Sequence, residues 1–111
     1  MTINDVVDSV DRLIEKNNFS RNPDRRFVFL GEELGEVARA LTKLEFIRKT
    51  IRHPFNPKIG EVKAAEDQLG DEIADLIWNA VAIGRISGID VDAAITRKLS
   101  DSDNRDFPKR T

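Results

Sequence analysis

Two long segments with the hydrophobic periodicity of an α-helix most constrain the fold of this 111-residue chain. Residues 24–50 and residues 61–87, with approximate ends, carry large apolar side chains at alternating spacings of three and four, which places them on one helix face. These side chains are Leu30, Leu34, Val37, Leu41 and Leu44 in the first segment and Leu69, Ile73, Leu76, Ala80 and Ile83 in the second. Strand-like alternation is absent, so the sequence predicts an all-α fold.

Proline and glycine divide the rest of the chain. Residues 53–60, which include His53, contain two prolines and a glycine and are expected to form a loop that lets the long helices pair antiparallel. Two shorter helices are expected: 4–17, capped by Asn4 or Thr2, and 91–99, capped by Asp90 after a stop at Gly88. We therefore expect one domain over residues 1–111, a helical bundle of four main helices.

The composition excludes several kinds of site. The chain has no cysteine, which rules out disulfides, zinc ribbons, thiol nucleophiles and iron–sulfur clusters, and its single histidine rules out multi-histidine metal centres. With a net charge of −2, the chain is not a polycation of the kind that binds nucleic acid. It also has no apolar run of membrane-spanning length. We expect a cytoplasmic protein with no membrane or nucleic-acid partner.

Each long segment carries an acidic turn surrounded by apolar residues. Residues 31–36 read GEELGE, and residues 70–75 read GDEIAD. In each turn acids recur at a spacing of three, so they share one helix face, and an antiparallel pairing would let the two turns face each other. We expect their apolar neighbours, which are Leu34, Val37, Ile73 and Leu76, to be buried.

A cluster of facing carboxylates is costly without a partner. Two like charges about 4 Å apart repel by about 4 kcal/mol at an effective dielectric constant near 20. Such a cluster must be protonated, turned into solvent, or bound to a cation. Carboxylate oxygens without histidine or cysteine suit Mg²⁺, Mn²⁺ or Ca²⁺. A solvated acidic face and a metal site both remain open at this point.

The acidic turns resemble those of a known family. The segment EELGE at residues 32–36, followed by EIAD at residues 72–75, is similar to the EExxE…ExxD signature of MazG-like all-α nucleoside triphosphate pyrophosphohydrolases. The stretch GIDVDAAITRK at residues 88–98 resembles the family's segment that ends in a helical lysine. The chain differs by a longer gap between the acidic motifs, by Ser102 where the family usually has asparagine, and by one extra residue in RDFP at 105–108.

The resemblance implies a function and roles for individual residues. It implies a nucleotide pyrophosphohydrolase that converts an NTP or dNTP to the monophosphate and pyrophosphate in nucleotide-pool house-cleaning, with Mg²⁺ as cofactor and Mn²⁺ as a substitute. Glu33, Glu36, Glu72 and Asp75 would be the metal ligands. Glu32 would bind metal through water or act as the base that orients the attacking water. The resemblance also implies a homodimer or homotetramer with sites near subunit interfaces.

The main candidates for substrate contacts are Lys98, Arg105, Trp78 and Asn79. Lys98 and Arg105 would contact phosphates, as would the arginines at 21, 25, 26 and 97, although solvated surface charge is the simpler explanation for any one of them. Trp78 lies one turn after the second acidic motif and would either pack in the core or stack on a base. Asn79 lies four residues after Asp75, on the same helix face, and is a candidate polar contact.

Two alternative functions stay open. A phosphoribosyl-ATP pyrophosphohydrolase is a relative with the same reaction, and only its substrate would distinguish it. A non-catalytic helical interaction module would show no dependence on metal. A di-iron carboxylate bundle is excluded, because such a site needs Glu-x-x-His pairs.

Overall fold

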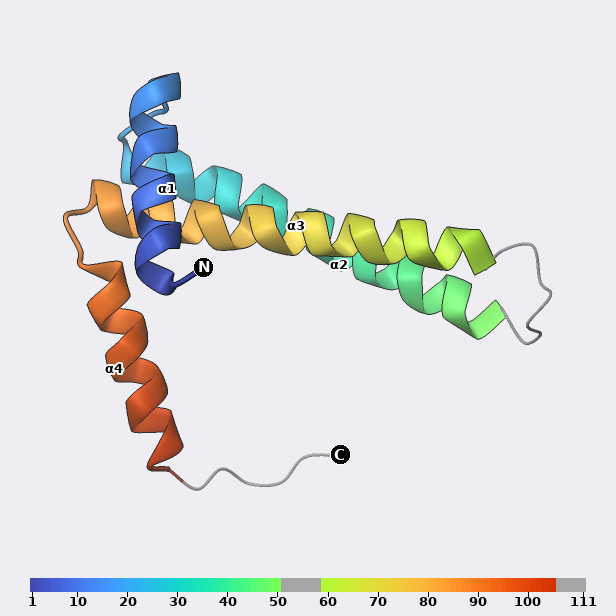
Figure 1. The fold of residues 1–111 in the computed structure, drawn as a ribbon. Coiled ribbons are helices and arrows are strands. Elements are labelled where there is room, and N and C mark those ends of the chain that lie inside the picture. Colours follow the sequence, from blue (N-terminus) through green and yellow to red (C-terminus); the bar gives the residue numbers. More distant parts are fainter. Residues whose placement is uncertain (51–58, 106–111) are drawn as a thin grey trace.

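The computed structural model describes residues 1–50 and 59–105, and these ranges form four α-helices and no strand (Figure 1). The helices are α1 (Ile3–Asn17), α2 (Pro23–Thr50), α3 (Ile59–Ile86) and α4 (Val91–Asp103). The two long helices α2 and α3 pair as an antiparallel hairpin, α1 crosses the C-terminal end of α3, and α4 turns away from the hairpin (Figure 1). The all-α fold predicted from the sequence is confirmed.

The helix ends follow local capping chemistry. Thr2 caps α1 through a capping box with Asp5, so the cap is Thr2 and not Asn4. The side chain of Asp90 caps α4 by accepting from the backbone N–H of Ala93 at 3.1 Å. Gly88 has a φ of 76°, the left-handed conformation that glycine adopts most easily, and it lies between α3 and α4 as expected.

Two boundaries differ from the sequence-based expectation. Helix α3 already begins at Ile59, so Gly60 lies in its first turn and not in the loop. Helix α4 continues past Leu99 to Asp103, because its polar last turn forms regular helix. The other residues of the expected loop, 53–58 with His53, lie outside the described residues, as do residues 106–108 of the tail.

The buried apolar residues form two separate clusters. One joins α1 to the end of α3 and contains Val7, Val10, Ile14, Val81 and Ala82. The other lies near the opposite end of the hairpin and contains Leu44, Ile47 and Ala65. The acidic turns at residues 31–36 and 70–75 lie along the hairpin between these clusters.

In the structure of a single chain, the expectation that all the apolar neighbours of the acids are buried is wrong. Leu34 is 59% exposed and Ile73 is 40% exposed. Successive helix residues point about 100° apart, since a turn holds 3.6 residues. When Glu33 and Glu72 face the partner helix, the adjoining apolar side chains therefore turn toward solvent.

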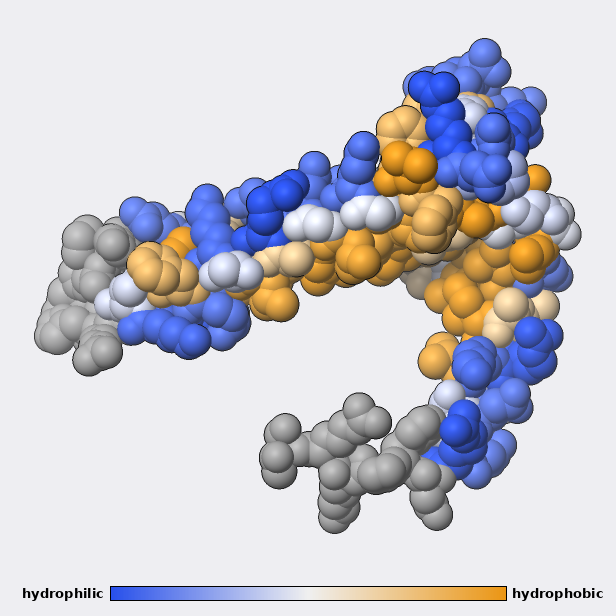
Figure 2. All heavy atoms as spheres, turned by 180° about the vertical axis from the view of Figure 1, so that it is seen from behind, coloured by the Kyte–Doolittle hydropathy of each residue, from blue (hydrophilic) through white to orange (hydrophobic). Residues whose placement is uncertain are grey.

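The chain leaves a broad apolar surface open. Its radius of gyration is 17.7 Å, against about 13 Å for a compact domain of this length. Figure 2 shows an apolar band along the hairpin that continues onto the concave side of α4. Large exposed apolar side chains on these helices include Phe27, Val28, Leu34, Leu41, Phe46, Ile73, Ile77 and Leu99. Within residues 1–50 and 59–105, no helix has the length and apolar character needed to cross a membrane.

Candidate metal centre

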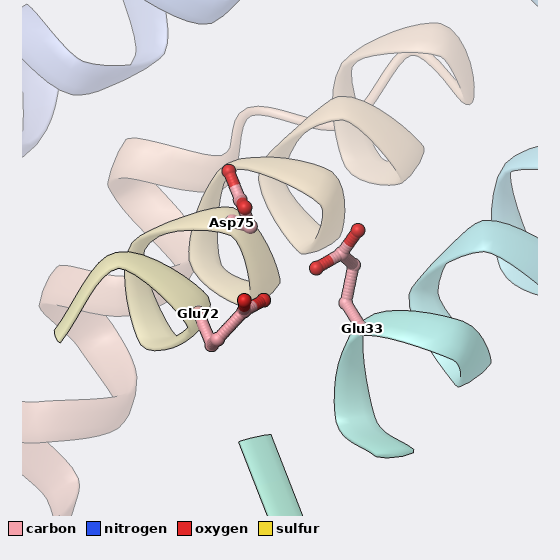
Figure 3. Close-up of side chains that lie close together, drawn as sticks. All are labelled: Glu33, Glu72 and Asp75. Carbon is pink, nitrogen blue, oxygen red and sulfur yellow. The ribbon is translucent and has the colours of Figure 1, made fainter. Parts of the chain in front are cut away.

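Three carboxylates from the two acidic turns meet between α2 and α3. Oxygens of Glu33 on α2 and of Glu72 and Asp75 on α3 all lie within 4.8 Å of one another. Figure 3 shows the Glu33 side chain reaching across the gap toward the two acids of α3. The spacing of three between Glu72 and Asp75 puts both on the face that α2 covers. The structure thus brings together three of the four acids expected as metal ligands.

The surroundings of these acids favour their neutral forms. Burial raises the pKa of Glu33 above its ordinary value, and the charges of Glu36, Asp75 and Glu32 raise that pKa further. The pKa of Glu72 is raised first by a hydrogen bond with Glu36, then by burial and by the charges of Glu36, Glu33 and Asp75. Repulsion among like charges and burial therefore act in the same direction on both side chains.

Two carboxylate oxygens of the cluster lack any hydrogen-bond partner. Glu33 Oε2 and Glu72 Oε2 are both buried and unpaired. Buried polar atoms in proteins almost always have a partner, so each such atom calls for a cation or a donor. A hard divalent cation such as Mg²⁺ accepts a ligand set that consists of carboxylate oxygens alone. The carboxylates present therefore fit Mg²⁺.

The other two predicted acids lie at the edge of the cluster. Glu36 lies outside the group of three, but its interaction with Glu72 is the largest cause of the raised pKa of Glu72. Glu36 Oε1 also lies 3.9 Å from Arg39 Nη2. Glu32 is exposed and raises the pKa of Glu33 through its charge. Glu36 is therefore a neighbour of the cluster, and Glu32 lies on its solvent side, where a role through water is compatible with its position.

The residues after the second acidic motif hold Asp75 in place. The indole Nε1 of Trp78 donates to Asp75 Oδ1 at 3.1 Å. The Asn79 side chain donates from Nδ2 to the backbone carbonyl of Asp75 at 2.8 Å. An outer hydrogen bond such as that of Trp78 orients the carboxylate of a metal ligand. Trp78 also stacks on Phe19, with ring centroids 5.9 Å apart.

A buried arginine lies beside this arrangement. Arg26 on α2 is only 5% exposed, and its Nη2 donates to Asn79 Oδ1 at 2.8 Å. Its guanidinium lies 5.3 Å from the ring centroids of Phe19 and Phe29 and 5.4 Å from that of Trp78. Burial lowers its pKa, although an arginine stays charged at any ordinary pH.

The sequence grouped Arg26 with exposed arginines as a phosphate contact and missed its burial. One signal was present: Arg26 precedes Glu33 by seven residues, two helical turns, and so shares its face.

A pocket of about 600 Å³ opens next to the metal centre. Its wall includes Glu33, Arg26, three aromatic side chains and Asn79, with the aromatics being Phe19, Phe29 and Trp78. Ligand pockets in proteins commonly have this size and this mixture of apolar walls with few polar groups. Glu33 belongs to both the pocket and the acidic cluster, so the pocket adjoins the cluster.

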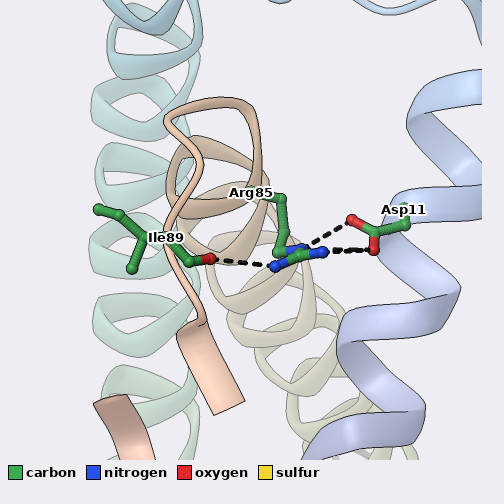
Figure 4. Close-up of polar contacts among 3 residues, drawn as sticks. All are labelled: Asp11, Arg85 and Ile89. Carbon is green, nitrogen blue, oxygen red and sulfur yellow. Dashed lines mark hydrogen bonds and ion pairs between the residues drawn. The ribbon is translucent and has the colours of Figure 1, made fainter. Parts of the chain in front are cut away.

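An ion pair fixes α1, the helix that leads into the pocket residues Asn18 and Phe19. Arg85 on α3 donates from Nε to Asp11 Oδ1 on α1 at 2.9 Å and from Nη2 to Oδ2 at 3.0 Å (Figure 4). Its Nη1 also donates to the backbone carbonyl of Ile89 at 3.0 Å. Helix α1 ends at Asn17, and the next residue, Asn18, has a left-handed φ of 50° that redirects the chain. This turn brings Phe19 onto Trp78.

The predicted phosphate contacts lie elsewhere in the chain. Lys98 is exposed on α4, and Arg105 follows the end of that helix. Helix α4 contacts α1 and α3 but not α2, and neither residue lines the pocket beside Glu33. The structure of a single chain therefore does not bring Lys98 or Arg105 to the acidic cluster.

Residues 21–107 match the MazG nucleotide pyrophosphohydrolase domain. The match covers most of the chain, including both acidic turns and the pocket residues of α2 and α3. This chain belongs to the MazG family. No curated protein and no solved structure matches it. The resemblance to the MazG family is therefore confirmed, and both acidic turns lie within the matched residues.

Proposed function

We propose that this MazG-family protein is a Mg²⁺-dependent nucleotide pyrophosphohydrolase. It would convert an NTP or dNTP and water to the monophosphate and pyrophosphate and so remove unwanted nucleotides from the pool. One observation carries the proposal: Glu33, Glu72 and Asp75 converge within 4.8 Å, and two of their buried oxygens have no partner. A triphosphate-bound cation would neutralise this cluster.

The roles of the residues follow from their positions. Glu33, Glu72 and Asp75, with Glu36 at the edge, would hold Mg²⁺, and Mn²⁺ would substitute because it accepts the same ligands. The bound metal would neutralise phosphate charge and lower the pKa of water. Glu32, on the solvent side, would accept the proton of the attacking water. Trp78 and Asn79 would keep Asp75 oriented.

We further propose that the active unit is a homodimer or homotetramer. The open shape and the exposed residues Leu34, Leu41, Ile73 and Ile77 support this, because monomeric proteins rarely expose a large contiguous apolar patch. A second copy packed on this face would bury them and would complete the bundle. Helix α4 of that copy would then be available to bring Lys98 and Arg105 to the phosphates, which their own chain does not do.

The bond that breaks is the most direct test of the reaction. We expect water to attack the α-phosphorus, so that the bond from this phosphorus to the bridging oxygen breaks and pyrophosphate leaves. Hydrolysis in water labelled with heavy oxygen should then place the label in the monophosphate. Label in orthophosphate would indicate an ordinary NTPase, and label in pyrophosphate would indicate attack at the β-phosphorus. Either result would overturn the proposal.

The substrate can be identified with a panel of canonical and modified nucleotides that includes phosphoribosyl-ATP. Each nucleotide is assayed for release of pyrophosphate with Mg²⁺. Cleavage of phosphoribosyl-ATP alone would support the relative with that activity. No release from any nucleotide, with or without metal, would instead support a non-catalytic helical module.

A further inference from the structure

The pocket beside the acidic cluster contains a charged group that the metal centre does not use. Arg26 is almost fully buried, and its Nε has no hydrogen-bond partner. We propose that this pocket binds the nucleobase of the substrate and that Arg26 selects bases that present a carbonyl oxygen to it. The proposal rests on the proposed function for the identity of the ligand as a nucleotide, but its test needs neither metal nor turnover.

The pocket has the position that a base needs. Because Glu33 forms part of both spaces, a nucleotide whose phosphates lie at the acidic cluster extends its base into the pocket. Arg26 lies two helical turns from Glu33, about 10 Å along the helix axis. It therefore faces the edge of the base that is farthest from the phosphates, which carries position 6 of a purine or position 4 of a pyrimidine.

The walls of the pocket suit a flat ring. Phe19, Phe29 and Trp78 are each half-buried, so part of each ring is open to the pocket. Any nucleobase can stack on such surfaces, since every base has a π-face. The aromatic walls therefore explain affinity for a base, but they do not distinguish one base from another.

Discrimination comes from Arg26 at the end of the pocket, because a guanidinium can only donate hydrogen bonds. Its Nη2 donates to Asn79 Oδ1, and its Nε has no partner. A carbonyl oxygen of a base accepts from this guanidinium, whereas an exocyclic amino group places donor against donor.

A purely structural role would leave this nitrogen unexplained. A buried cation without full hydrogen bonding is costly, and a well-packed apolar side chain often stabilises a protein as well or better. The stack of aromatic rings offsets part of the cost through cation–π attraction. A ligand carbonyl would supply the missing acceptor.

The test uses pairs of nucleotides that differ at this one edge. Inosine and adenosine monophosphates differ by a carbonyl against an amino group at position 6, and uridine and cytidine monophosphates differ in the same way at position 4. Trp78 is the only tryptophan in the sequence, so its indole N–H resonance reports on the pocket without ambiguity. Titrations are done in EDTA, so they are independent of metal binding and catalysis.

We expect the carbonyl member of each pair to shift the Trp78 resonance with about tenfold higher affinity, the effect of one hydrogen bond to a charged donor. Equal affinities within both pairs, or tighter binding of the amino members, would overturn selection by Arg26. A resonance that no nucleotide shifts at millimolar concentration would overturn the base pocket. The proposed hydrolysis would survive both results, since it is measured separately with Mg²⁺.

Two variants identify the source of the preference. Arg26→Met keeps an unbranched apolar side chain and removes the guanidinium donors. We expect both members of each pair to bind this variant with about equal affinity. Arg25→Met is the matched control: Arg25 also lines the pocket but is exposed. It should weaken both members of a pair equally and keep their ratio. If Arg25→Met removes the preference and Arg26→Met keeps it, the assignment to Arg26 is wrong. If Arg26→Met does not fold, the wild-type titrations still decide.

Discussion

The contact between α2 and α3 has two parts with opposite physical character. Toward the turn of the hairpin, Leu44, Ile47 and Ala65 pack as a buried apolar cluster. Nearer to α1, the same two helices meet through Glu33, Glu72 and Asp75. Burial raises the pKa of Glu33 most, Glu36 raises that of Glu72 most, and repulsion among the acids adds to both shifts. The apolar part stabilises the hairpin by burial, whereas the acidic part destabilises it unless its charge is neutralised. The difference supports the proposal that the acidic part binds a cation.

The largest effect is expected when the acidic part loses one ligand charge. Asp75→Asn keeps the shape of the side chain and an oxygen that accepts from Trp78, but it removes a negative charge. We expect kcat to fall at least about a hundredfold. Removing a hydrogen-bond partner of a metal ligand already lowers activity by up to about a hundredfold, and this change alters a ligand itself. The helical circular-dichroism signal should be unchanged.

Asp71→Asn is the control for this change. Asp71 lies on the same helix but is exposed and outside the carboxylate cluster, so its turnover should stay near that of wild type. Equal losses in both variants would mean that the cluster is not the site.

The apolar part should respond in the opposite way. Leu44 is 3% exposed, and Leu44→Ala leaves a cavity that should lower the free energy of unfolding by about 3 kcal/mol. Chemical denaturation measures this loss, and turnover per folded molecule should be retained. If the variant loses turnover while still folded, the two parts of the interface are not separate in function.

A smaller effect is expected one step outside the cluster. Trp78→Phe keeps an aromatic ring against Phe19 but removes the N–H that donates to Asp75. We expect about a tenfold loss of metal affinity, the lower end for an outer hydrogen bond. Calorimetric titration with Mn²⁺ measures it. Unchanged affinity would show that the indole packs in the core and does not orient the ligand.

The pH dependence of stability should also distinguish the two parts. Because the pKa values of Glu33 and Glu72 are raised in the folded protein, the folded state holds these protons more tightly than the unfolded state. This contribution is fully present below the ordinary carboxyl pKa and is lost as pH rises through the raised values. In EDTA, the melting temperature should therefore fall more steeply with pH for wild type than for Glu33→Gln. Parallel curves would contradict the assignment.

The sequence predicted the helices and the facing acids because both depend on local spacing. Residues 31–36 and 70–75 each place acids on one helix face, and the antiparallel pairing brings the faces together. Other features depend on tertiary contacts that no local pattern specifies. The left-handed turn at Asn18 and the ion pair of Arg85 with Asp11 bring Phe19 to Trp78, and the resulting aromatic walls bury Arg26.

The exposure of Leu34 and Ile73 was missed for a different reason. Periodicity identifies an apolar face but does not tell whether that face packs against the same chain or a second one. Within one chain, the acids occupy the face that α2 and α3 share, and these apolar side chains stay exposed.

The central claim is that the acidic part of the α2–α3 contact binds a divalent cation, and a Mg²⁺ titration of the melting temperature tests it most directly. Ionic strength is held constant with KCl, so general screening does not change. The account predicts that the melting temperature of wild type and of Asp71→Asn rises with Mg²⁺ through the millimolar range, because binding to the folded state stabilises it. Asp75→Asn should show little or no rise. An unchanged melting temperature in wild type, or an equal rise in Asp75→Asn, would contradict the claim.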